Sequence, residues 1–245
     1  MQIMKYESFA MWMQEATTSR LSIRGVLATL VVSVVLAELF GYALHRLMHS
    51  GRIQSISRAH MIHHLQLYGP DQAMRAAVYK DATDGRPALG NIGVEWLAPS
   101  AAILAICWLV LWRSGVAWPY QVLALATLIG WPLFMFSYLH DRMHLQRFWM
   151  ARAPVVKIWF RRARRFHDVH HRSLSDEGRM NCNFGIGFFF FDAVLGTLAK
   201  RHRPMNWRGY GVAMRRHSVE VYSRSARFAD VHAAMDERIE ELPPA

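Results

Sequence analysis

Cysteine is scarce in this chain, with two residues in 245. Cys107 lies in an apolar run and Cys182 in a polar segment, so they form no spaced pair typical of a disulfide framework, a zinc knuckle or a thiol redox motif. The sequence also lacks a nicotinamide-binding glycine fingerprint, a haem-attachment motif and an HExxH motif. No motif in the sequence therefore indicates thiol, haem or nicotinamide chemistry. The cysteine count does not show whether the protein lies in an oxidising or a reducing compartment.

Acidic residues are also few, with 18 Asp and Glu against 29 Lys and Arg and a net charge of +11. A strongly basic chain can bind nucleic acid, but no nucleic-acid reader motif is present. The basic residues instead flank long apolar segments, and 53% of the chain is apolar. This distribution is typical of a membrane protein and gives no support to a nucleic-acid partner.

Three apolar runs approach the length of about 20 helical residues that crosses a bilayer. They cover residues 26–44, 92–112 and 119–139. The first run continues directly into histidines and lacks a small-residue cleavage site, so we interpret it as a retained span rather than a signal peptide. Only Arg113–Trp118, with Gly115 as a turn residue, separates the other two runs. These two runs are predicted to form a hairpin of membrane helices.

Basic residues orient the predicted spans. The hairpin tip holds only Arg113, whereas residues 142–172 are rich in arginine. The segment after the first run contains four arginines, namely Arg46, Arg52, Arg58 and Arg75. By the positive-inside rule the two arginine-rich segments are cytoplasmic. The sequence thus predicts a multi-pass integral membrane protein, of the inner membrane in a bacterium or of the endoplasmic reticulum in a eukaryote.

The predicted fold class is all-α, as a single membrane-embedded domain over residues 1–245 with about three to four transmembrane helices. A cytoplasmic helical cap would comprise residues 45–75 and 140–184. Residues 1–24 are a polar N-terminal segment, and residues 217–245 are a polar tail. The apolar patch Gly185–Leu198 is too short and glycine-rich to span the membrane, so we expect it to be re-entrant or to lie in the interface.

Ten of the thirteen histidines fall into four motifs, and this is the strongest signal in the chain. The motifs are HRLMH (His45, His49), HMIHH (His60, His63, His64), HDRMH (His140, His144) and HDVHH (His167, His170, His171). In a helix, residues three and four apart share a face, so each motif would present its imidazoles in one direction. That arrangement suits a metal site.

The number of histidines favours two metal ions over one. Imidazole suits Zn, Cu, Fe or Ni, whereas Mg and Ca prefer oxygen. A zinc ion takes about four ligands, fewer than the ten histidines available. The hairpin between the second and third motifs crosses the membrane twice and returns the chain to the same face. All ten imidazoles can therefore meet at the cytoplasmic boundary.

In this order, HxxxH, HxxHH, a helical hairpin, HxxxH and HxxHH resemble the fatty acid hydroxylase and sterol desaturase superfamily of integral-membrane di-iron oxygenases. The resemblance covers residues 36–197. Tyr68–Pro70 resembles the family's Tyr-Pro element, and NFG at 183–185 with Phe191, Asp192, Gly196 and Thr197 is similar to its closing pattern, although Phe191 stands where Trp is frequent. The HxxxH spacing of the first motif is closer to the sterol-oxidase and simple hydroxylase branches than to carotenoid hydroxylases.

The resemblance implies two iron ions that use O2 to hydroxylate or desaturate a C–H bond of a membrane lipid, such as a fatty acyl chain or a sterol-like lipid. Electrons would come from a separate ferredoxin or cytochrome b5-like donor. Carotenoid ring hydroxylation is an alternative within the superfamily. A histidine-rich metal transporter is an alternative of another class, but polar groups inside the spans are scarce apart from Glu38. A zinc hydrolase would need the Glu base that the motifs lack.

The ten histidines are the predicted ligands, and no further catalytic residue is assigned. Asp141 and Asp168 each follow a motif histidine and either fix imidazole tautomers or pair with arginine on a helix surface. Asn183 either supports a bound water or caps a turn, and Glu38 is expected to face the protein interior. Four arginines beside the last motif either dock an acidic electron donor or contact anionic lipid: Arg161, Arg162, Arg164 and Arg165.

Overall fold

The computed structural model describes residues 21–69, 88–89, 92–93, 97–201 and 203–222. This part of the chain is helical, apart from one short antiparallel pair in which β1 (Ala88–Leu89) pairs with β2 (Ile92–Gly93). The longer helices are α2 (Ile23–Ser50), α3 (Gln54–Ile62), α4 (Leu97–Arg113), α5 (Trp118–Pro132), α7 (Lys157–His171) and α9 (Trp207–Tyr222). The all-α class is confirmed, with the β pair as an addition.

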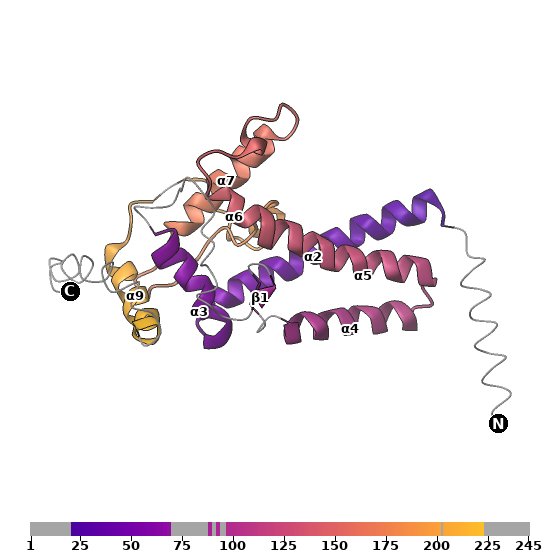
Figure 1. The fold of residues 1–245 in the computed structure, drawn as a ribbon, viewed down its shortest axis with the longest axis horizontal. Coiled ribbons are helices and arrows are strands. Elements are labelled where there is room, and N and C mark those ends of the chain that lie inside the picture. The colour runs from indigo at the N-terminus through magenta and orange to yellow at the C-terminus, as the bar shows by residue number, and fades with distance from the viewer. Residues whose placement is uncertain (1–20, 70–87, 90–91, 94–96, 202, 223–245) are drawn as a thin grey trace, which may run out of the picture.

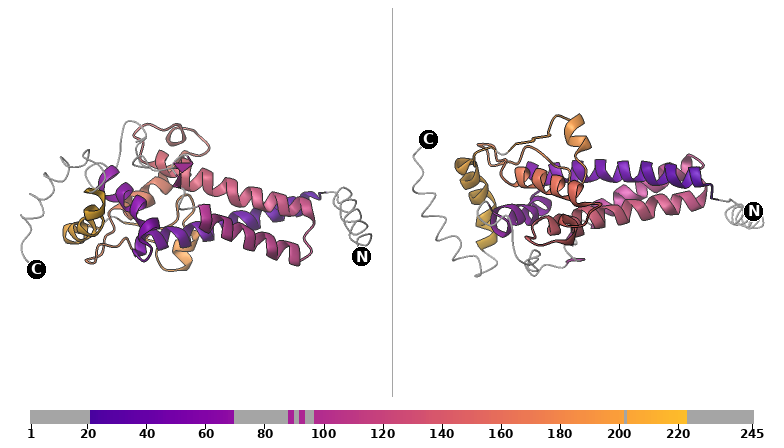
Figure 2. Two further views of the ribbon diagram at one scale, coloured as in Figure 1. Left: turned by 60° about the horizontal axis from the view of Figure 1, so that its bottom comes forward. Right: turned by 90° about the horizontal axis from the view of Figure 1, so that it is seen from above.

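Three apolar helices form one end of the molecule. Helices α2, α4 and α5 run side by side and extend away from the remaining elements, which gather at the opposite end (Figure 1). The turned views in Figure 2 show the same division. Exposed apolar side chains cover the outside of the extended end, among them Leu27, Val31, Ile106 and Val110.

Helix α2 buries one face along its length and exposes the other. Its N-cap is Ser22, whose hydroxyl oxygen accepts a hydrogen bond from the Gly25 N–H at 3.0 Å, and it ends at Gly51 in the left-handed region. Every fourth residue of one stripe is buried: Ser33, Ala37, Gly41, His45 and His49. Glu38 is also buried and accepts a hydrogen bond from Trp131 Nε1 at 2.7 Å, which confirms that it faces the interior.

The helical hairpin is present, but its first helix begins later than predicted. Residues Ile92–Gly93 belong to β2, and α4 begins at Leu97 with 17 residues. Gly115, with φ of 67°, turns the chain before Pro119 in the first turn of α5. Two helices in the described residues are long and apolar enough to cross a membrane, Ile23–Ser50 and Trp118–Met143, and α4 is shorter.

Two π-helical segments lie beside histidine motifs. The first, η1 (His63–Leu67), continues α3, and the Tyr68 N–H donates to the His63 carbonyl at 2.9 Å. The second, η3 (Leu133–Leu139), follows Pro132 and leads into α6 (His140–Met143). A proline within a helix removes a backbone donor, and wider turns of this kind are frequent at functional sites. Both segments set the direction of the histidines beside them.

The cap is built on two apolar clusters. The first joins η3, α6, η4 (Trp149–Ala151) and α7, with Met135 and Phe160 fully buried. The second packs α9 against η1, where the Tyr210 hydroxyl donates to the Leu65 carbonyl at 2.7 Å. Within the apolar patch 185–198, α8 (Phe190–Val194) has five residues, which is too short to cross a bilayer. The N-terminal segment before residue 21 and the tail after residue 222 lie outside the described residues.

Candidate metal centre

The fold brings all ten motif histidines together in two neighbouring clusters. In each cluster, one possible ligand atom from each of the five rings lies within 4.8 Å of the others. Nine of the ten are buried and His60 is half-buried. The first cluster contains His45, His49, His60, His64 and His170; the second contains His63, His140, His144, His167 and His171.

The two clusters have matching compositions. Each HxxxH motif gives both histidines to one cluster, and each HxxHH motif gives its first and last histidines to one cluster and its middle histidine to the other. Adjacent helical residues point about 100° apart, because a turn contains about 3.6 residues. His63 and His64 therefore face different clusters, as do His170 and His171. Each cluster thus has two pairs at spacing four and one crossing member.

Ring-nitrogen distances in the first cluster fit a shared metal ion. His49 Nε2 lies 3.2 Å from His45 Nε2, 3.0 Å from His60 Nε2 and 3.0 Å from His170 Nε2. One ring nitrogen carries a single hydrogen or a single lone pair, so hydrogen bonding cannot satisfy three such neighbours. Two nitrogens bound to one metal at about 2.1 Å lie about 3.0–3.4 Å apart. The observed separations match this range.

The second cluster shows the same pattern. His144 Nε2 lies 3.1 Å from His63 Nε2 and 3.0 Å from His167 Nε2, which lies 3.1 Å from His171 Nε2. His140 Nε2 is buried and has no hydrogen-bond partner among the described residues. A buried polar nitrogen without a partner is costly, and a metal ion would satisfy it. Both sets of residues therefore fit a metal ion.

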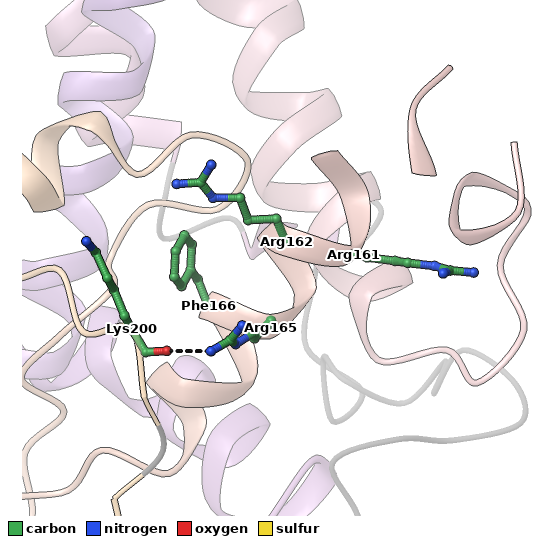
Figure 3. A pocket seen from close by; sticks show the side chains of 5 residues that line it. All are labelled: Arg161, Arg162, Arg165, Phe166 and Lys200. Atoms are coloured by element: carbon green, nitrogen blue, oxygen red, sulfur yellow. Dashed lines mark hydrogen bonds between the residues drawn. The ribbon is translucent and has the colours of Figure 1, made fainter. Parts of the chain in front are cut away.

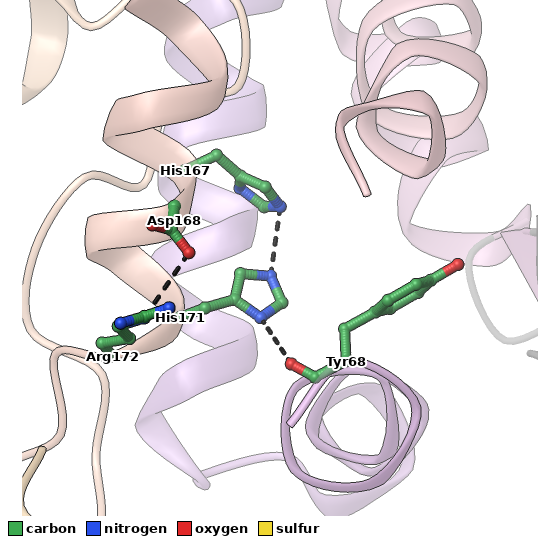
Figure 4. Close-up of polar contacts among 5 residues, drawn as sticks. All are labelled: Tyr68, His167, Asp168, His171 and Arg172. Carbon is green, nitrogen blue, oxygen red and sulfur yellow. Dashed lines mark hydrogen bonds and ion pairs between the residues drawn. The ribbon is translucent and has the colours of Figure 1, made fainter. Parts of the chain in front are cut away.

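Backbone carbonyls fix the opposite nitrogen of three rings. His45 Nδ1 donates to the Phe184 carbonyl and His170 Nδ1 donates to the Cys182 carbonyl, both at 2.6 Å. His171 Nδ1 donates to the Tyr68 carbonyl at 3.3 Å, as Figure 4 shows. A hydrogen on Nδ1 leaves the Nε2 lone pair free for a metal, and such outer contacts orient metal-binding histidines.

Electrostatics keep these imidazoles neutral. Burial, followed by the charge of neighbouring histidines, holds the pKa of His63, His64 and His167 well below the usual 6.5. The same causes lower the pKa of His60 and His171. A neutral imidazole is the form that binds a metal ion.

A buried carboxylate holds the loop that supplies two of these carbonyls. Asp192 Oδ1 accepts hydrogen bonds from the Phe184 N–H and the Thr197 hydroxyl, and Oδ2 accepts one from the Gly185 N–H, all at 2.7 Å. Its side chain is fully buried. Burial raises the pKa of Asp192, and the hydrogen bond from Thr197 opposes that shift. The carboxylate fixes the position of the loop on which His45 and His170 depend.

Asn183 belongs to the same loop and acts on the backbone. Its Nδ2 donates to the Phe166 and Ala199 carbonyls at 3.0 and 2.8 Å, and its Oδ1 accepts from the Ala199 N–H at 2.8 Å. Its φ of 53° lies in the left-handed region, which asparagine tolerates better than most residues. These contacts join the loop to α7 and to the segment that follows α8.

The two aspartates differ in their surroundings. Asp141 is buried on α6 next to His140. Asp168 is one-third exposed and lies 3.5 Å from Arg172 Nε one turn later, so its carboxylate faces an arginine (Figure 4). The geometry of Asp168 is that of the surface ion pair, which was one of its two expected roles.

Sequence reasoning did not assign roles to Tyr68 and Asp192. The Tyr68 ring stacks on His144 with a centroid distance of 3.8 Å, in addition to its carbonyl contact with His171. Both residues belong to short elements that carried the family resemblance, and that was the only signal. Tyr68 contacts residues more than 70 positions away in the chain. Asp192 contacts the backbone of the loop that precedes it. Residue spacing does not predict contacts of either kind.

The four arginines of α7 are not equivalent. Arg161, Arg162 and Arg165 are exposed and line one surface cavity. Arg164 turns inward, where its NH2 group donates to the Leu145 carbonyl at 2.9 Å and its guanidinium lies 4.8 Å from the Phe160 ring centroid. Arg164 therefore supports the apolar core of the cap.

Comparison of the chain with protein-family models, curated proteins and solved structures found no match. The two clusters and the long apolar helices are thus the findings on which a functional interpretation rests.

Proposed function

We propose that this protein is a membrane-bound di-iron oxygenase that hydroxylates or desaturates a C–H bond of a lipid. The observation that carries the proposal is the pair of adjacent five-histidine clusters, placed where two long apolar helices enter the cap. The order of the histidine motifs, which resembles that of the fatty acid hydroxylase and sterol desaturase superfamily, supports the choice of reaction.

The donor set supports a transition metal at each cluster. Five imidazoles exceed the four ligands of a structural zinc site, and imidazole suits iron, copper, nickel and zinc. Iron follows from the family resemblance. Two bound iron ions, reduced by a separate donor, would supply the activation of O2 that a C–H bond requires.

The residues of the chain have three roles in this proposal. The ten histidines would hold the metal ions through ring nitrogens that point into the two clusters. The carbonyls of Tyr68, Cys182 and Phe184 keep the hydrogen on Nδ1 of their partner histidines. Burial of the clusters excludes water, which protects a reactive centre from side reactions.

The exposed apolar surface supports a membrane lipid as substrate. Several apolar side chains along α2 and α4 are more than half exposed, among them Leu27, Val31, Ile106 and Val110, which water would disfavour and a bilayer would not. Glu38 is the only acidic residue of α2 and its Oε1 is engaged by Trp131. An ion pathway through this helix, as a metal transporter would require, therefore has little support.

Lipid analysis of cells with and without the protein tests the reaction. We expect a lipid that gains about 16 mass units or loses about 2, which correspond to oxygen insertion or dehydrogenation. His63→Ala and His170→Ala each remove the crossing member of one cluster and should abolish the product while the protein still inserts into the membrane.

The matched control is His217→Ala, which removes a buried histidine outside both clusters and should retain product. Full product formation by both cluster variants would refute the proposal. Absence of any altered lipid in cells that contain the iron-loaded protein and a reducing system would refute it as well.

A further inference from the structure

Two cavities adjoin on the surface of α7, and no histidine is among the described residues that line them. The first, of about 470 Å³, is lined by Arg161, Arg162, Arg165, Phe166 and Lys200. The second, of about 310 Å³, shares Arg162 and Phe166 with the first and is otherwise lined by aliphatic, aromatic and glycine residues: Trp159, Ala163, Gly187, Phe188, Phe189, Phe190, Ala193 and Leu198. A cationic space therefore continues into an apolar one.

Three of the cations lie around the Phe166 ring. Figure 3 shows Arg162 and Lys200 on either side of the Phe166 ring, with Arg165 below it, whereas Arg161 points away. The Arg162 guanidinium lies 5.5 Å from the Phe166 ring centroid, and Arg165 donates to the Lys200 carbonyl at 3.0 Å. No acidic residue is among the described residues that line either cavity. The cationic space is thus suited to an anion with several oxygen acceptors.

Exposed apolar side chains surround this position. Phe190 and Val194 on α8 are 64% and 63% exposed, and Ile158 at the start of α7 is 75% exposed. Apolar residues at such exposure beside arginines are typical of a surface that lies in the headgroup region of a bilayer. The carboxylates of an acidic protein could pair with these arginines, but such a partner would leave the aromatic cavity unfilled.

We propose that the two cavities form one binding site for an anionic acyl lipid. Arg162, Arg165 and Lys200 bind the phosphate of the headgroup, and the aromatic cavity takes the first part of an acyl chain. The site is separate from the histidine clusters, and its occupancy does not depend on bound metal or on product formation.

Binding of short-chain lipids to the purified full-length protein in a neutral detergent tests the site. The probes are dioctanoyl phosphatidic acid, dioctanoylglycerol and inorganic phosphate, and native mass spectrometry or thermophoresis reports binding. We expect phosphatidic acid to bind at least about tenfold more tightly than either of the others, because only it occupies both spaces. Equal binding of inorganic phosphate would identify a free-anion site and overturn the proposal.

Two kinds of variant locate the ligand. Arg162→Gln with Lys200→Gln should weaken phosphatidic acid binding by roughly tenfold or more through loss of charge-assisted hydrogen bonds. Ala193→Trp, at an exposed position, should weaken it by filling the apolar cavity. The matched control Arg215→Gln removes an exposed charge from α9 and should leave binding unchanged.

Unchanged lipid binding in the Arg162/Lys200 and Ala193 variants would overturn the proposal. A second result would also overturn it: the Arg162/Lys200 variant loses binding to an acidic ferredoxin but still binds the lipid. That result would assign the surface to protein docking. Because the measurement needs no turnover, its result is independent of the iron content and of the lipid product that test the proposed oxygenase.

Discussion

At the scale of single residues, the two histidines of each HH pair belong to different clusters, so the two clusters can be tested one at a time. The loop at 182–185 holds only first-cluster histidines, His45 and His170, through its carbonyls. A change that loosens this loop should therefore affect one cluster before the other.

Replacement of Asp192 by Asn tests this asymmetry. The Asp192 carboxylate accepts hydrogen bonds from the N–H groups of Phe184 and Gly185. In the Asn variant, the side-chain NH2 would face one of these N–H groups, and two donors cannot form a hydrogen bond. We expect a loss of about 2 kcal/mol in the free energy of unfolding and weaker metal binding by the first cluster, with the second cluster retained. Chelator titration followed by metal analysis measures both.

Asp168→Asn is the matched control, because Asp168 is a partly exposed carboxylate paired with Arg172. Surface pairs contribute about 0–1 kcal/mol, so little change is expected. Simultaneous loss of metal from both clusters in the Asp192 variant would contradict the proposed role of the loop.

Prediction from sequence worked best for the histidines and least well for their outer contacts. The spacing of the four motifs and the hairpin between them predicted that all ten imidazoles meet. The expectation that each motif presents its imidazoles in one direction was wrong for the two HxxHH motifs, because adjacent helical residues point about 100° apart. The carbonyls of Cys182 and Phe184 could not be predicted, since a backbone oxygen leaves no trace in residue identity. Asp192 was part of the family resemblance, but the sequence did not indicate what its side chain does.

At the scale of elements, α2 packs closely against α5 and against η3. At Gly41 an added Cβ would collide with the Phe136 ring of η3. At Gly25, near the start of α2, an added Cβ would collide with Tyr120 of α5, and the Ser22 N–H donates to the Tyr120 hydroxyl at 2.9 Å. Small residues at such points let helices pack closely in membranes.

Gly41→Ala should push α2 away from Phe136 in η3 and destabilise the protein by about 1–3 kcal/mol, the usual cost of overpacking. Because His45 lies one turn after Gly41, metal binding should weaken as well. Phe136→Ala in the same chain should restore part of the stability, which a double-mutant cycle in thermal unfolding measures.

The control for this prediction is Gly130→Ala on α5, where an added Cβ meets nothing within 4 Å. Alanine there should be neutral or raise stability by about 0.5–1 kcal/mol, because it favours the helix. An equal loss in the Gly41 and Gly130 variants would show that a general effect of alanine on helices, and not the contact of α2 with Phe136, is responsible.

The apolar runs predicted these helices well: α2 is longer than its run, and the third run, 119–139, falls in α5 and η3. The start of α4 was missed, because Ile92 and Gly93 are apolar or neutral and hydropathy does not separate a strand from a helix over so few residues. The π-helical segments η1 and η3 could not be predicted either. Pro132 directly precedes η3, and no residue of this kind precedes η1.

At the scale of the whole molecule, the arrangement predicts a membrane orientation. The histidine clusters lie at one end of the long helices, and the turn at residues 114–117 lies at the other (Figure 1). The arginine-rich cap should face the cytoplasm by the positive-inside rule.

Cysteine labelling in intact cells measures this orientation. In a chain whose two cysteines are replaced by serine, Ser114→Cys should react with a membrane-impermeant maleimide from outside, and Glu177→Cys should react only after the membrane is opened. Both positions are exposed, so access is decided by the bilayer. Labelling of both from the same side would contradict the spanning arrangement.

The central claim is that two metal ions are held by two separate sets of five imidazoles, and metal content per chain tests it most directly. Protein produced with iron should contain two iron ions per chain, and His49→Ala and His144→Ala should each retain one, because each removes a member of a different cluster. A content below one iron in the unchanged protein, or loss of all metal in both variants to the same degree, would contradict the account.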